Sequence, residues 1–321
     1  MIELKEYNAE IASDKYAEIT DLVYANGAKP SLDNKANAIA HFGLEQEDEV
    51  QAFISVFKNA AFADALVLGN YQCVDEDDIA KQLFLEIEKY AKSLNVKNLV
   101  GPMNGDSWHG YRYSVLDKPS FFLEAVQKSY YLKQWHNVEF ATLANYQTNR
   151  EVIQHHIALP DYNAYFKEKG ITVRHFNMAE SKAELRLLHS FCSQLFKNNL
   201  FFSPISGKDF VAMYEPILPF LNPSLIYYFM DKDVMVGLLF AVENRFNPKE
   251  IIVKTIARHP AKKYKGLAHM FSALFHHDLI EMGVETMLHA YFQVDNNSAK
   301  VSSNYGGEMY QQHVLLSKSL Q

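Results

Sequence analysis

A short basic turn carries the residues of this chain that are best suited to binding an anion. Its cationic residues are Lys262, Lys263 and Lys265, and it ends at Gly266, where an apolar pattern of helical period begins. The first turn of a helix has unpaired backbone N–H groups and the positive end of the helix dipole, and both attract phosphate. The spacing therefore predicts a phosphate-binding turn, with a solvated basic turn as the alternative.

Two regular elements must flank this turn and position it. Residues 250–258 are rich in β-branched side chains, which predicts a strand, and Pro260 ends it. From residue 267 to residue 282, apolar side chains recur every three or four positions, which predicts a helix with one buried face. A further strand is expected at residues 287–292.

The stretch 101–113 is a second place where side chains that commonly contact ligands gather. Trp108, His109, Tyr111 and Arg112 follow a predicted strand, where open α/β sheets hold their ligand loops. These four residues are therefore candidates for substrate contacts. The sequence leaves the alternative, an aromatic plug between two domains, equally open.

An internal repeat relates two parts of the chain at a constant offset of 188 residues. Under this ungapped alignment the apolar faces of two predicted helices coincide, and so do the strands that follow them. The coinciding pairs are Ile79 with Leu267, Leu83 with Phe271, Ile87 with Phe275, Ala91 with Leu279 and Leu94 with Met282. The repeat predicts two copies of one fold.

The two copies differ in charge at the turn. In the same alignment Lys263 falls on Asp75 and Lys265 falls on Asp77. Carboxylates would repel a phosphate at close range, at a cost on the order of 1 kcal/mol for each pair of like charges in water. We therefore expect the phosphate site in the second copy alone.

Length, composition and the order of elements predict a two-domain α/β protein. The chain has 321 residues, of which 48% are hydrophobic, and this is enough for two buried cores. Each copy predicts the order strand, helix, three strands, helix, strand, which is typical of a mixed sheet with helices on both faces. The polar stretch 149–170 predicts a linker, and a boundary at Pro160 gives the domains 1–160 and 161–321.

Charge and composition argue against several classes of partner. The net charge of -7 argues against nucleic acid as a main partner. No signal-like segment opens the sequence and no apolar run reaches a membrane span, so we expect a cytoplasmic protein with no membrane partner. Cys73 and Cys192 predict buried thiols in a reducing compartment. The histidine pairs at 155–156 and 276–277 lack metal-ligand spacing, so no metal is expected.

The run Pro260-x-x-Lys263-x-x-Gly266-Leu267-Ala268 resembles the acyl-CoA pyrophosphate loop of the GNAT superfamily of N-acyltransferases. The family pattern has arginine or glutamine where this chain has Lys263. Lysine supplies positive charge but lacks the planar guanidinium group of arginine. The resemblance implies that acetyl-CoA or another acyl-CoA binds here. It implies that the pyrophosphate is held by Lys263, Tyr264, Lys265, Gly266, Leu267 and Ala268, and the pantetheine arm by Ile256 and Arg258.

A second signature of the family, Asn-x-x-Ala followed by a tyrosine and then Gly-Phe, is similar to residues 296–308. Asn296 matches it and is implied to bind the cofactor, whereas Glu308 replaces the phenylalanine. The tyrosine, which protonates the leaving thiolate in the family, is replaced by Ser303. Since a serine hydroxyl is a poor proton donor to a thiolate, Ser303 could only position a water molecule.

The implied fold is a pair of tandem GNAT-like domains, each a mixed, mostly antiparallel sheet flanked by helices, of which the first is degenerate. The implied reaction transfers an acyl group from acyl-CoA to a small amine, in the C-terminal domain near the domain junction. His289 and Glu243 are candidates for the general base, with ordinary surface or structural roles as the alternative.

Two other functions stay open at this point. One is a non-catalytic acyl-CoA-binding or regulatory module, which the replacement at Ser303 motivates. The other is a Fem-type aminoacyl transferase, which the acidic charge balance disfavours. The sequence does not define the acyl chain, the amine or the oligomeric state.

Overall fold

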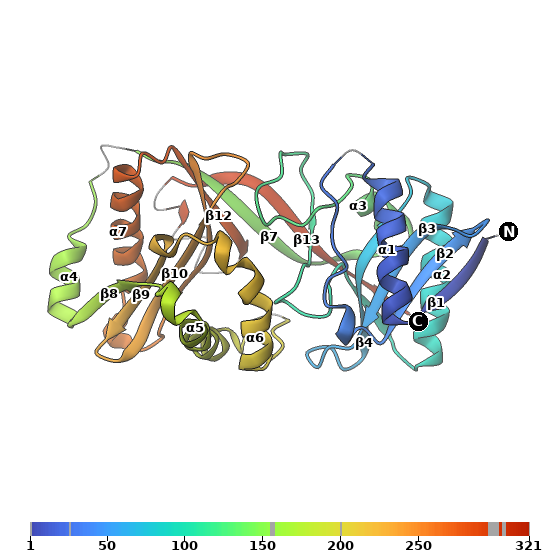
Figure 1. Ribbon diagram of the computed structural model, residues 1–321, viewed down its shortest axis with the longest axis horizontal. Helices are drawn as coiled ribbons and strands as arrows, with labels where there is room; N and C mark the ends of the chain where they lie inside the picture. Colours follow the sequence, from blue (N-terminus) through green and yellow to red (C-terminus); the bar gives the residue numbers. More distant parts are fainter. Residues whose placement is uncertain are drawn as a thin grey trace. The chain divides into compact units, whose positions relative to one another are not determined.

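The computed structural model describes residues 2–25, 27–154, 158–199, 201–294, 302–303 and 306–320. The chain divides into two compact units, whose elements are labelled in Figure 1. Unit 1 comprises Met1–Asn145, Leu200–Ser203 and Gln312–Gln321, and unit 2 comprises Tyr146–Asn199 and Pro204–Gln311. The units are thus discontinuous in sequence, unlike the consecutive stretches 1–160 and 161–321 expected from the sequence.

Unit 1 is built on a mixed sheet. Its strands, in spatial order, are β1 (Ile2–Tyr7), β2 (Ala40–Gln46), β3 (Glu49–Phe57), β4 (Ala65–Cys73), β5 (Asn98–Gly101) and the end of β13 (Glu308–Ser319). Neighbouring strands are antiparallel except β4 and β5, which run parallel. The short β6 (Tyr113–Ser114) pairs with β13. Every residue of β4 is buried, as expected for a central strand that is covered on both faces.

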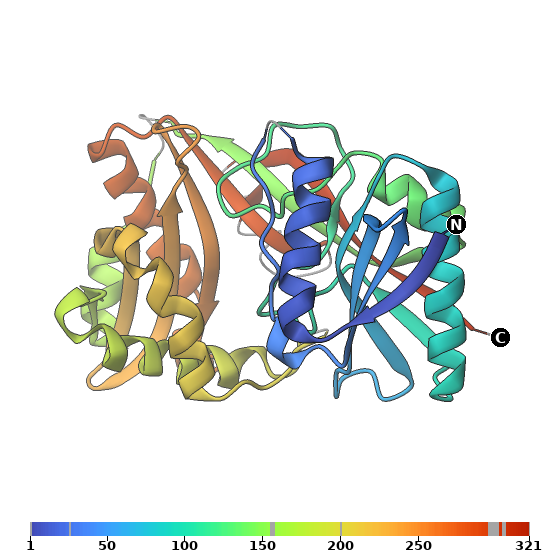
Figure 2. The ribbon, with the colours of Figure 1, turned by 45° about the vertical axis from the view of Figure 1, so that its right-hand side comes forward.

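Two helices cover opposite faces of this sheet, as Figure 2 shows. α1 (Ala9–Val23) begins after Asn8, whose side chain accepts hydrogen bonds from two backbone N–H groups of the first turn. Tyr16 on α1 packs edge-on against Phe53 of β3. α2 (Asp77–Ser93) packs its apolar stripe against the other face. Both contacts are possible because alternate side chains of a strand point to opposite faces.

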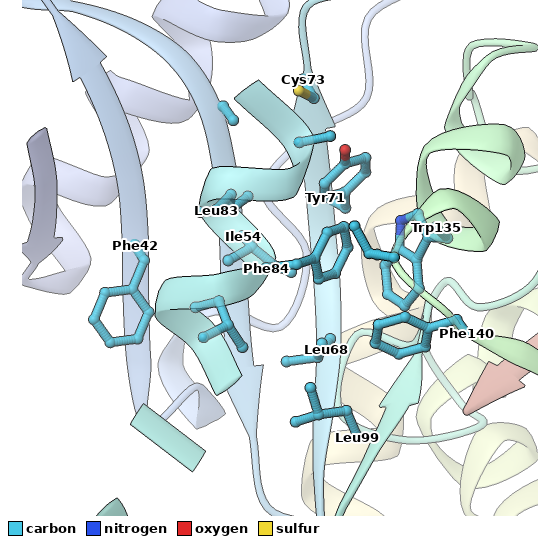
Figure 3. Close-up of a cluster of buried hydrophobic side chains, with 14 of the residues drawn as sticks. Phe42, Ile54, Leu68, Tyr71, Cys73, Leu83, Phe84, Leu99, Trp135 and Phe140 are labelled. Carbon is cyan, nitrogen blue, oxygen red and sulfur yellow. The ribbon is translucent and has the colours of Figure 1, made fainter. Parts of the chain in front are cut away.

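The core between α2 and the sheet is aromatic (Figure 3). Trp135, on α3 (Tyr131–Asn137), contacts the rings of Tyr71, Phe84 and Phe140 edge-on, with centroid distances of 5.6, 4.9 and 4.6 Å. The edge-on arrangement suits the ring quadrupoles and adds to the gain from burial. This cluster therefore fixes α2 and α3 on the sheet.

Unit 2 has a sheet of the same kind. Its strands, in spatial order, are β7 (Ala141–Val152), β12 (Thr286–Gln293), β11 (Glu250–Arg258), β10 (Val234–Glu243), β9 (Ile226–Asp231) and β8 (Ile171–His175). Neighbouring strands are antiparallel except β11 and β12, which run parallel. The mixed, mostly antiparallel sheets confirm the fold class predicted from the sequence.

Helices flank this second sheet on both faces. They are α4 (Tyr162–Lys169), α5 (Ser181–Phe196), α6 (Gly207–Tyr214) and α7 (Leu267–Glu281). Phe229 of β9 contacts Phe166 on α4 and Phe271 on α7. Its neighbour Tyr228 points to the other face and donates a hydrogen bond to the carbonyl of Glu184 on α5, at 3.5 Å. The alternation along β9 therefore assigns α4 and α7 to one face and α5 to the other.

Short 3-10 helices connect these elements in the described chain. They are η1 (Lys35–Asn37), η2 (Met178–Glu180), η3 (Glu215–Phe220), η4 (Pro223–Leu225) and η5 (Lys262–Tyr264). Within the described ranges, no helix is long and apolar enough to cross a membrane.

The structure supports the internal repeat for the helices and corrects it for the turns. The four leading apolar pairs of α2 and α7 are buried, whereas the last pair, Leu94 and Met282, is exposed in both copies. The turn between β4 and α2 has three residues, 74–76, and the turn between β11 and α7 has eight, 259–266. The ungapped alignment therefore does not equate the residues of the two turns.

Candidate functional site

The strands β11 and β12 separate halfway along their length. They pair in parallel register from Glu250 with Thr286 to Val253 with His289. Although β11 continues to Arg258 and β12 to Gln293, the described residues beyond Val253 and His289 make no further pairs between the two strands. Among the described residues, no strand pairs with the β12-facing edge of residues 255–258, so this edge can accept another hydrogen-bonding partner.

A small cavity lies where the two strands separate, under α7. Its lining is mostly apolar and includes two imidazoles and one hydroxyl group. The lining residues are Leu239, Val253, Ile256, Ser272, Phe275, His276, Met287 and His289. The predicted base His289 and the predicted cofactor residue Ile256 thus meet at one cavity.

A buried carboxylate lies between the two imidazoles of this cavity. Oε2 of Glu151, on β7, is 3.1 Å from Nε2 of His289. Its other oxygen, Oε1, is 3.1 Å from Nδ1 of His276 on α7. The side chain of Glu151 is 0% exposed. Burial of a carboxylate costs free energy unless it is paired, so the two imidazoles are its natural partners.

The contacts of Glu151 are close but not ideally directed. Within the described residues, neither carboxylate oxygen of Glu151 makes a hydrogen bond of good angular geometry. The separations of 3.1 Å to His276 and His289 are nevertheless hydrogen-bond distances. Contacts at catalytic groups are often misaligned without substrate and tighten when substrate binds.

The basic turn ends in a conformation that requires glycine. Gly266 has a φ of 92°, which residues with a Cβ rarely adopt, and a Cβ there would meet no atom closer than 3.8 Å. Leu267 and Ala268 then open α7. Within the described residues, their backbone N–H groups have no hydrogen-bond acceptor, as expected at a helix N-terminus. Both N–H groups are therefore available to an anion.

The charge of Lys263 is already partly neutralised. Its Nζ lies 2.7 Å from Oδ2 of Asp231, and the hydroxyl of Tyr264 donates to the same oxygen, also at 2.7 Å. The hydrogen bond to Asp231 raises the pKa of Lys263 to about 12, and the same bond lowers the pKa of Asp231. Lys265 is exposed and, among the described residues, has no carboxylate within ion-pair distance.

The remaining predicted residues occupy different places. Nη1 of Arg258, at the end of β11, donates to the carbonyl of His259 at 3.0 Å. Glu243 lies opposite Ile251, at the closed end of the sheet, and accepts a hydrogen bond from Nδ2 of Asn222 at 2.9 Å. The structure therefore does not bring Glu243 to the cavity.

The region of the second signature is described only in part. Asn296 lies outside the described residues. Ser303 is exposed, whereas its neighbour Ser302 is buried and accepts a hydrogen bond from Nδ2 of Asn149 at 2.8 Å. Asn149 is paired with His289 across β7 and β12. The backbone at residues 302–303 is therefore tied to the strand beside His289.

In unit 1, the space between the corresponding strands is filled by the chain itself. β4 and β5 pair in parallel only from Ala65 to Val67. Beyond that point the N–H of Met103 donates to the carbonyl of Leu68 at 2.8 Å. Oδ1 of Asn104 accepts from the N–H of Asn70 at 2.7 Å. A Cβ on Gly69 would overlap the carbonyl oxygen of Met103, so a glycine is needed for this close approach.

Side chains of unit 1 also occupy the end of β4. The hydroxyl of Tyr130 donates to the carbonyl of Cys73 at 2.9 Å, and Nε2 of Gln134 donates to the carbonyl of Val74 at 2.8 Å. These are the backbone positions that lead into the acidic turn. Unit 1 therefore has, within its described residues, no open strand edge of the kind seen at β11.

The four candidate substrate residues have partners within unit 1. Nε1 of Trp108 donates to the carbonyl of Ser203 at 2.7 Å. Nδ1 of His109 lies 2.9 Å from Asp106. Burial lowers the pKa of His109, but the hydrogen bond to Asp106 together with the charges of Asp106 and Asp33 outweighs this, and the pKa is raised. The guanidinium of Arg112 stacks 3.7 Å above the ring of Tyr111. The loop is thus held by its own contacts.

Glu151 and His276 are the site residues that the sequence did not reveal. Glu151 lies in the stretch 149–170, for which the sequence predicts a linker, and His276 belongs to a histidine pair whose spacing does not indicate a metal site. Within the described part of the chain, no group of His, Cys, Asp or Glu is arranged to hold a metal ion. Alternating apolar residues past residue 149 would have indicated a buried strand, but the sequence lacks this pattern there.

Solved structures with a similar fold cover the whole chain. They include a GCN5-related N-acetyltransferase from Sphaerobacter thermophilus, with a TM-score of 0.54 and 11% identity over 100% of this chain and 96% of that one. A tandem GNAT protein from the clavulanic acid biosynthesis pathway has a TM-score of 0.58 and 11% identity, over 100% and 99% of the two chains. A probable N-acyltransferase from Enterococcus faecalis V583 has a TM-score of 0.62 and 6% identity, over 100% and 72%. No protein-family model matches the sequence, and no curated protein matches it significantly.

Proposed function

We propose that this chain, whose fold is that of the tandem GNAT proteins, transfers an acyl group from an acyl-CoA to a small amine. We place the reaction in unit 2. The observation that carries this proposal is the separation of β11 from β12 at His289, which opens a strand edge beside a cavity lined by His289, whose Nε2 contacts the buried carboxylate of Glu151.

The binding of acyl-CoA would use the open edge of β11 and the turn that follows it. Backbone groups at Ile256 and Arg258 would pair with the pantetheine amides, which require alternating donors and acceptors. The N–H groups of Leu267 and Ala268 and the ammonium of Lys265 would hold the pyrophosphate. Acetyl-CoA is the first acyl-CoA to test, because the cavity beside His289 is small.

The chemistry would need one base. As the amine nitrogen bonds to the acyl carbon, the carbon–sulfur bond breaks and the nitrogen loses a proton. His289 would accept that proton, directly or through one water molecule. Ser303, which is exposed near the same strand, would position the water that returns a proton to the sulfur. Backbone N–H groups of the open β11 edge would stabilise the oxyanion.

Unit 1 would then be a degenerate copy. Its strand edge is occupied by Met103 and Asn104, and its turn is short and acidic. We therefore expect one acyl-CoA for each chain. Titration calorimetry that gave two equivalent sites would contradict this part of the proposal.

The decisive experiment measures binding and turnover separately. Acetyl-CoA at a hundred times its dissociation constant should stabilise the protein by about 2.7 kcal/mol. Thiol release from acetyl-CoA, measured with a panel of amines, should fall on the order of 10²- to 10⁴-fold in His289→Gln, while the stabilisation by acetyl-CoA is retained.

The possible failures have different meanings. A protein that no acyl-CoA stabilises would refute the proposal. Stabilisation without thiol release above background, for every amine and acyl chain tried, would favour the non-catalytic acyl-CoA-binding module. Equal turnover in the wild type and His289→Gln would remove His289 from the reaction.

A further inference from the structure

We propose that Glu151 is the positioning residue of this site and that His276 fixes Glu151 in turn. The inference rests on the proposed function, because it assigns His289 the role of base. It adds that the base works as one member of a three-residue unit, His276–Glu151–His289.

The sheet itself sets the placement of this unit. Glu151 is paired with Met287 across β7 and β12, and His289 lies two residues beyond Met287 on the same strand. Side chains at i and i+2 share a face, and both Met287 and His289 line the cavity. Glu151 therefore meets His289 as a diagonal cross-strand neighbour. Its position depends on strand register rather than on a loop.

The contact selects which nitrogen of His289 can act. Nε2 is the atom that lies 3.1 Å from Oε2 of Glu151. A carboxylate accepts hydrogen bonds, so it favours the tautomer with the proton on Nε2 and leaves Nδ1 with the lone pair. Nδ1 would then accept the amine proton. The imidazolium formed in this step would lie beside a carboxylate that is fully shielded from water, where the attraction between charges is strong.

His276 contacts the second carboxylate oxygen of Glu151. It lies on α7, is 1% exposed, and its Nδ1 is 3.1 Å from Oε1. With Oε1 engaged by the helix, Oε2 is directed to His289 on the strand. Without this contact the carboxylate could rotate about its last torsion and release His289.

The first test is kinetic. Glu151→Gln keeps the volume and removes the charge, so kcat should fall about tenfold to a hundredfold, less than the loss expected for the base itself. The KM for acetyl-CoA should change little, because the described ionic contacts of Glu151 are with His276 and His289 and not with the turn that would hold the pyrophosphate. In a His289→Gln background, Glu151→Gln should lower kcat no further, since the carboxylate acts through that ring. Glu151→Asp, which keeps the charge, should recover part of the loss.

A matched control is available two strands away, on β11. Glu250 is also a buried carboxylate and is paired with Arg150 at 2.8 Å, but it lies at the closed end of β11 and does not line the cavity. Glu250→Gln should lower thermal stability and leave kcat near the wild-type value. An equal loss of kcat in both variants would show that any damage to a buried carboxylate suffices, and this would overturn the inference.

A second measurement does not depend on turnover. In ¹⁵N spectra of histidine-labelled protein, the wild-type ring of His289 should be in the Nε2–H form, and Glu151→Gln should shift the tautomer balance. His276→Asn, whose amide can donate from the place of Nδ1, should keep the Nε2–H form, whereas His276→Leu should not. An unchanged His289 signal in Glu151→Gln would overturn the positioning role even if that variant lost activity by misfolding.

The outcomes separate the two proposals. Turnover in the wild type with unchanged kcat in Glu151→Gln would overturn this inference and leave the proposed function standing. A wild type without turnover would overturn the proposed function, while the tautomer measurement would still decide whether Glu151 orients His289.

Discussion

Asp231, at the end of β9, holds Lys263 in an ion pair with 2.7 Å between Oδ2 and Nζ. Lys263 is the residue that replaces the arginine or glutamine of the family pattern, and 63% of its side chain is exposed. A phosphate at the turn would compete with Asp231 for the same ammonium. The affinity of the turn for an anion would therefore depend on a carboxylate that lies outside the sequence motif.

Reversal of the charge at the turn should abolish binding of acetyl-CoA. Lys263→Glu combined with Lys265→Glu places two carboxylates at the N-terminus of α7, where they would repel the pyrophosphate. The thermal shift with acetyl-CoA should disappear, and the unliganded melting temperature should change little, because exposed charges contribute little to folding.

The matched control for this variant is Lys182→Glu combined with Lys208→Glu, two exposed lysines on α5 and α6. It changes the net charge by the same amount away from the turn and should keep the full shift. Loss of the shift in both double variants would indicate a general effect of charge.

Removal of the carboxylate of Asp231 should strengthen binding. Asp231→Asn releases Lys263, and we expect the dissociation constant of acetyl-CoA to fall about twofold to fivefold, the range of effects measured for exposed ion pairs. The effect should vanish in a Lys263→Met background, because the substitution at position 231 would then have no ammonium to release. A gain in affinity that persists without Lys263 would mean that Asp231 acts on the ligand directly.

Loss of an aromatic side chain from the unit 1 core should destabilise the fold strongly. Phe84→Ala leaves a cavity between Tyr71, Trp135 and Phe140 (Figure 3), and we expect a loss of about 3–5 kcal/mol in the free energy of unfolding. Leu85→Ala on the same helix is the control, since Leu85 is 47% exposed and its loss should cost less than about 0.5 kcal/mol. Urea unfolding of both variants measures the difference.

The stability of unit 1 should fall as the pH drops below 6.5. Burial lowers the pKa of His41 from its ordinary value of 6.5, and its Nδ1 lies 2.9 Å from the hydroxyl of Ser55. The unfolded chain therefore takes up a proton on His41 at a higher pH than the folded chain does. The stabilisation is complete above pH 6.5 and is lost as the pH falls through the folded pKa.

The variant His41→Gln removes this titration and should flatten the dependence of the urea midpoint on pH between about 7.5 and 5.5. His109 should act in the opposite direction, because its pKa is raised. A variant of His41 with the same pH dependence as the wild type would assign the effect to other groups.

The elements of the fold could be predicted because their signals are local. The periods of 250–258 and 267–282 define β11 and α7, and Gly266 defines the turn between them. The filling of the unit 1 site by Met103 and Asn104 could not be predicted in the same way. It depends on hydrogen bonds to β4 from residues 34 and 35 positions away in the sequence, which no short pattern encodes.

The residues of the candidate site also divide into those with a local sequence signal and those that depend on distant parts of the chain. His289 can be proposed from the sequence because it is a histidine on the strand predicted after the helix, and the structure places it at the cavity. Glu151 was not, because its role arises from the pairing of β7 with β12, more than a hundred residues apart in the chain. Glu243 is a candidate by residue type alone, and its position at the closed end of the sheet separates it from the cavity.

Because Glu151 precedes residue 160, a fragment cut at the boundary expected from the sequence would lack one residue of the proposed site, although unit 2 begins at Tyr146. A product that began at residue 161 would keep the basic turn, α7 and His289, yet it would lack β7. The edge of β12 would then be unpaired and prone to aggregation, and His276 and His289 would have lost their shared carboxylate. Addition of a peptide with the sequence of residues 141–153 to such a fragment should restore both the edge and the carboxylate.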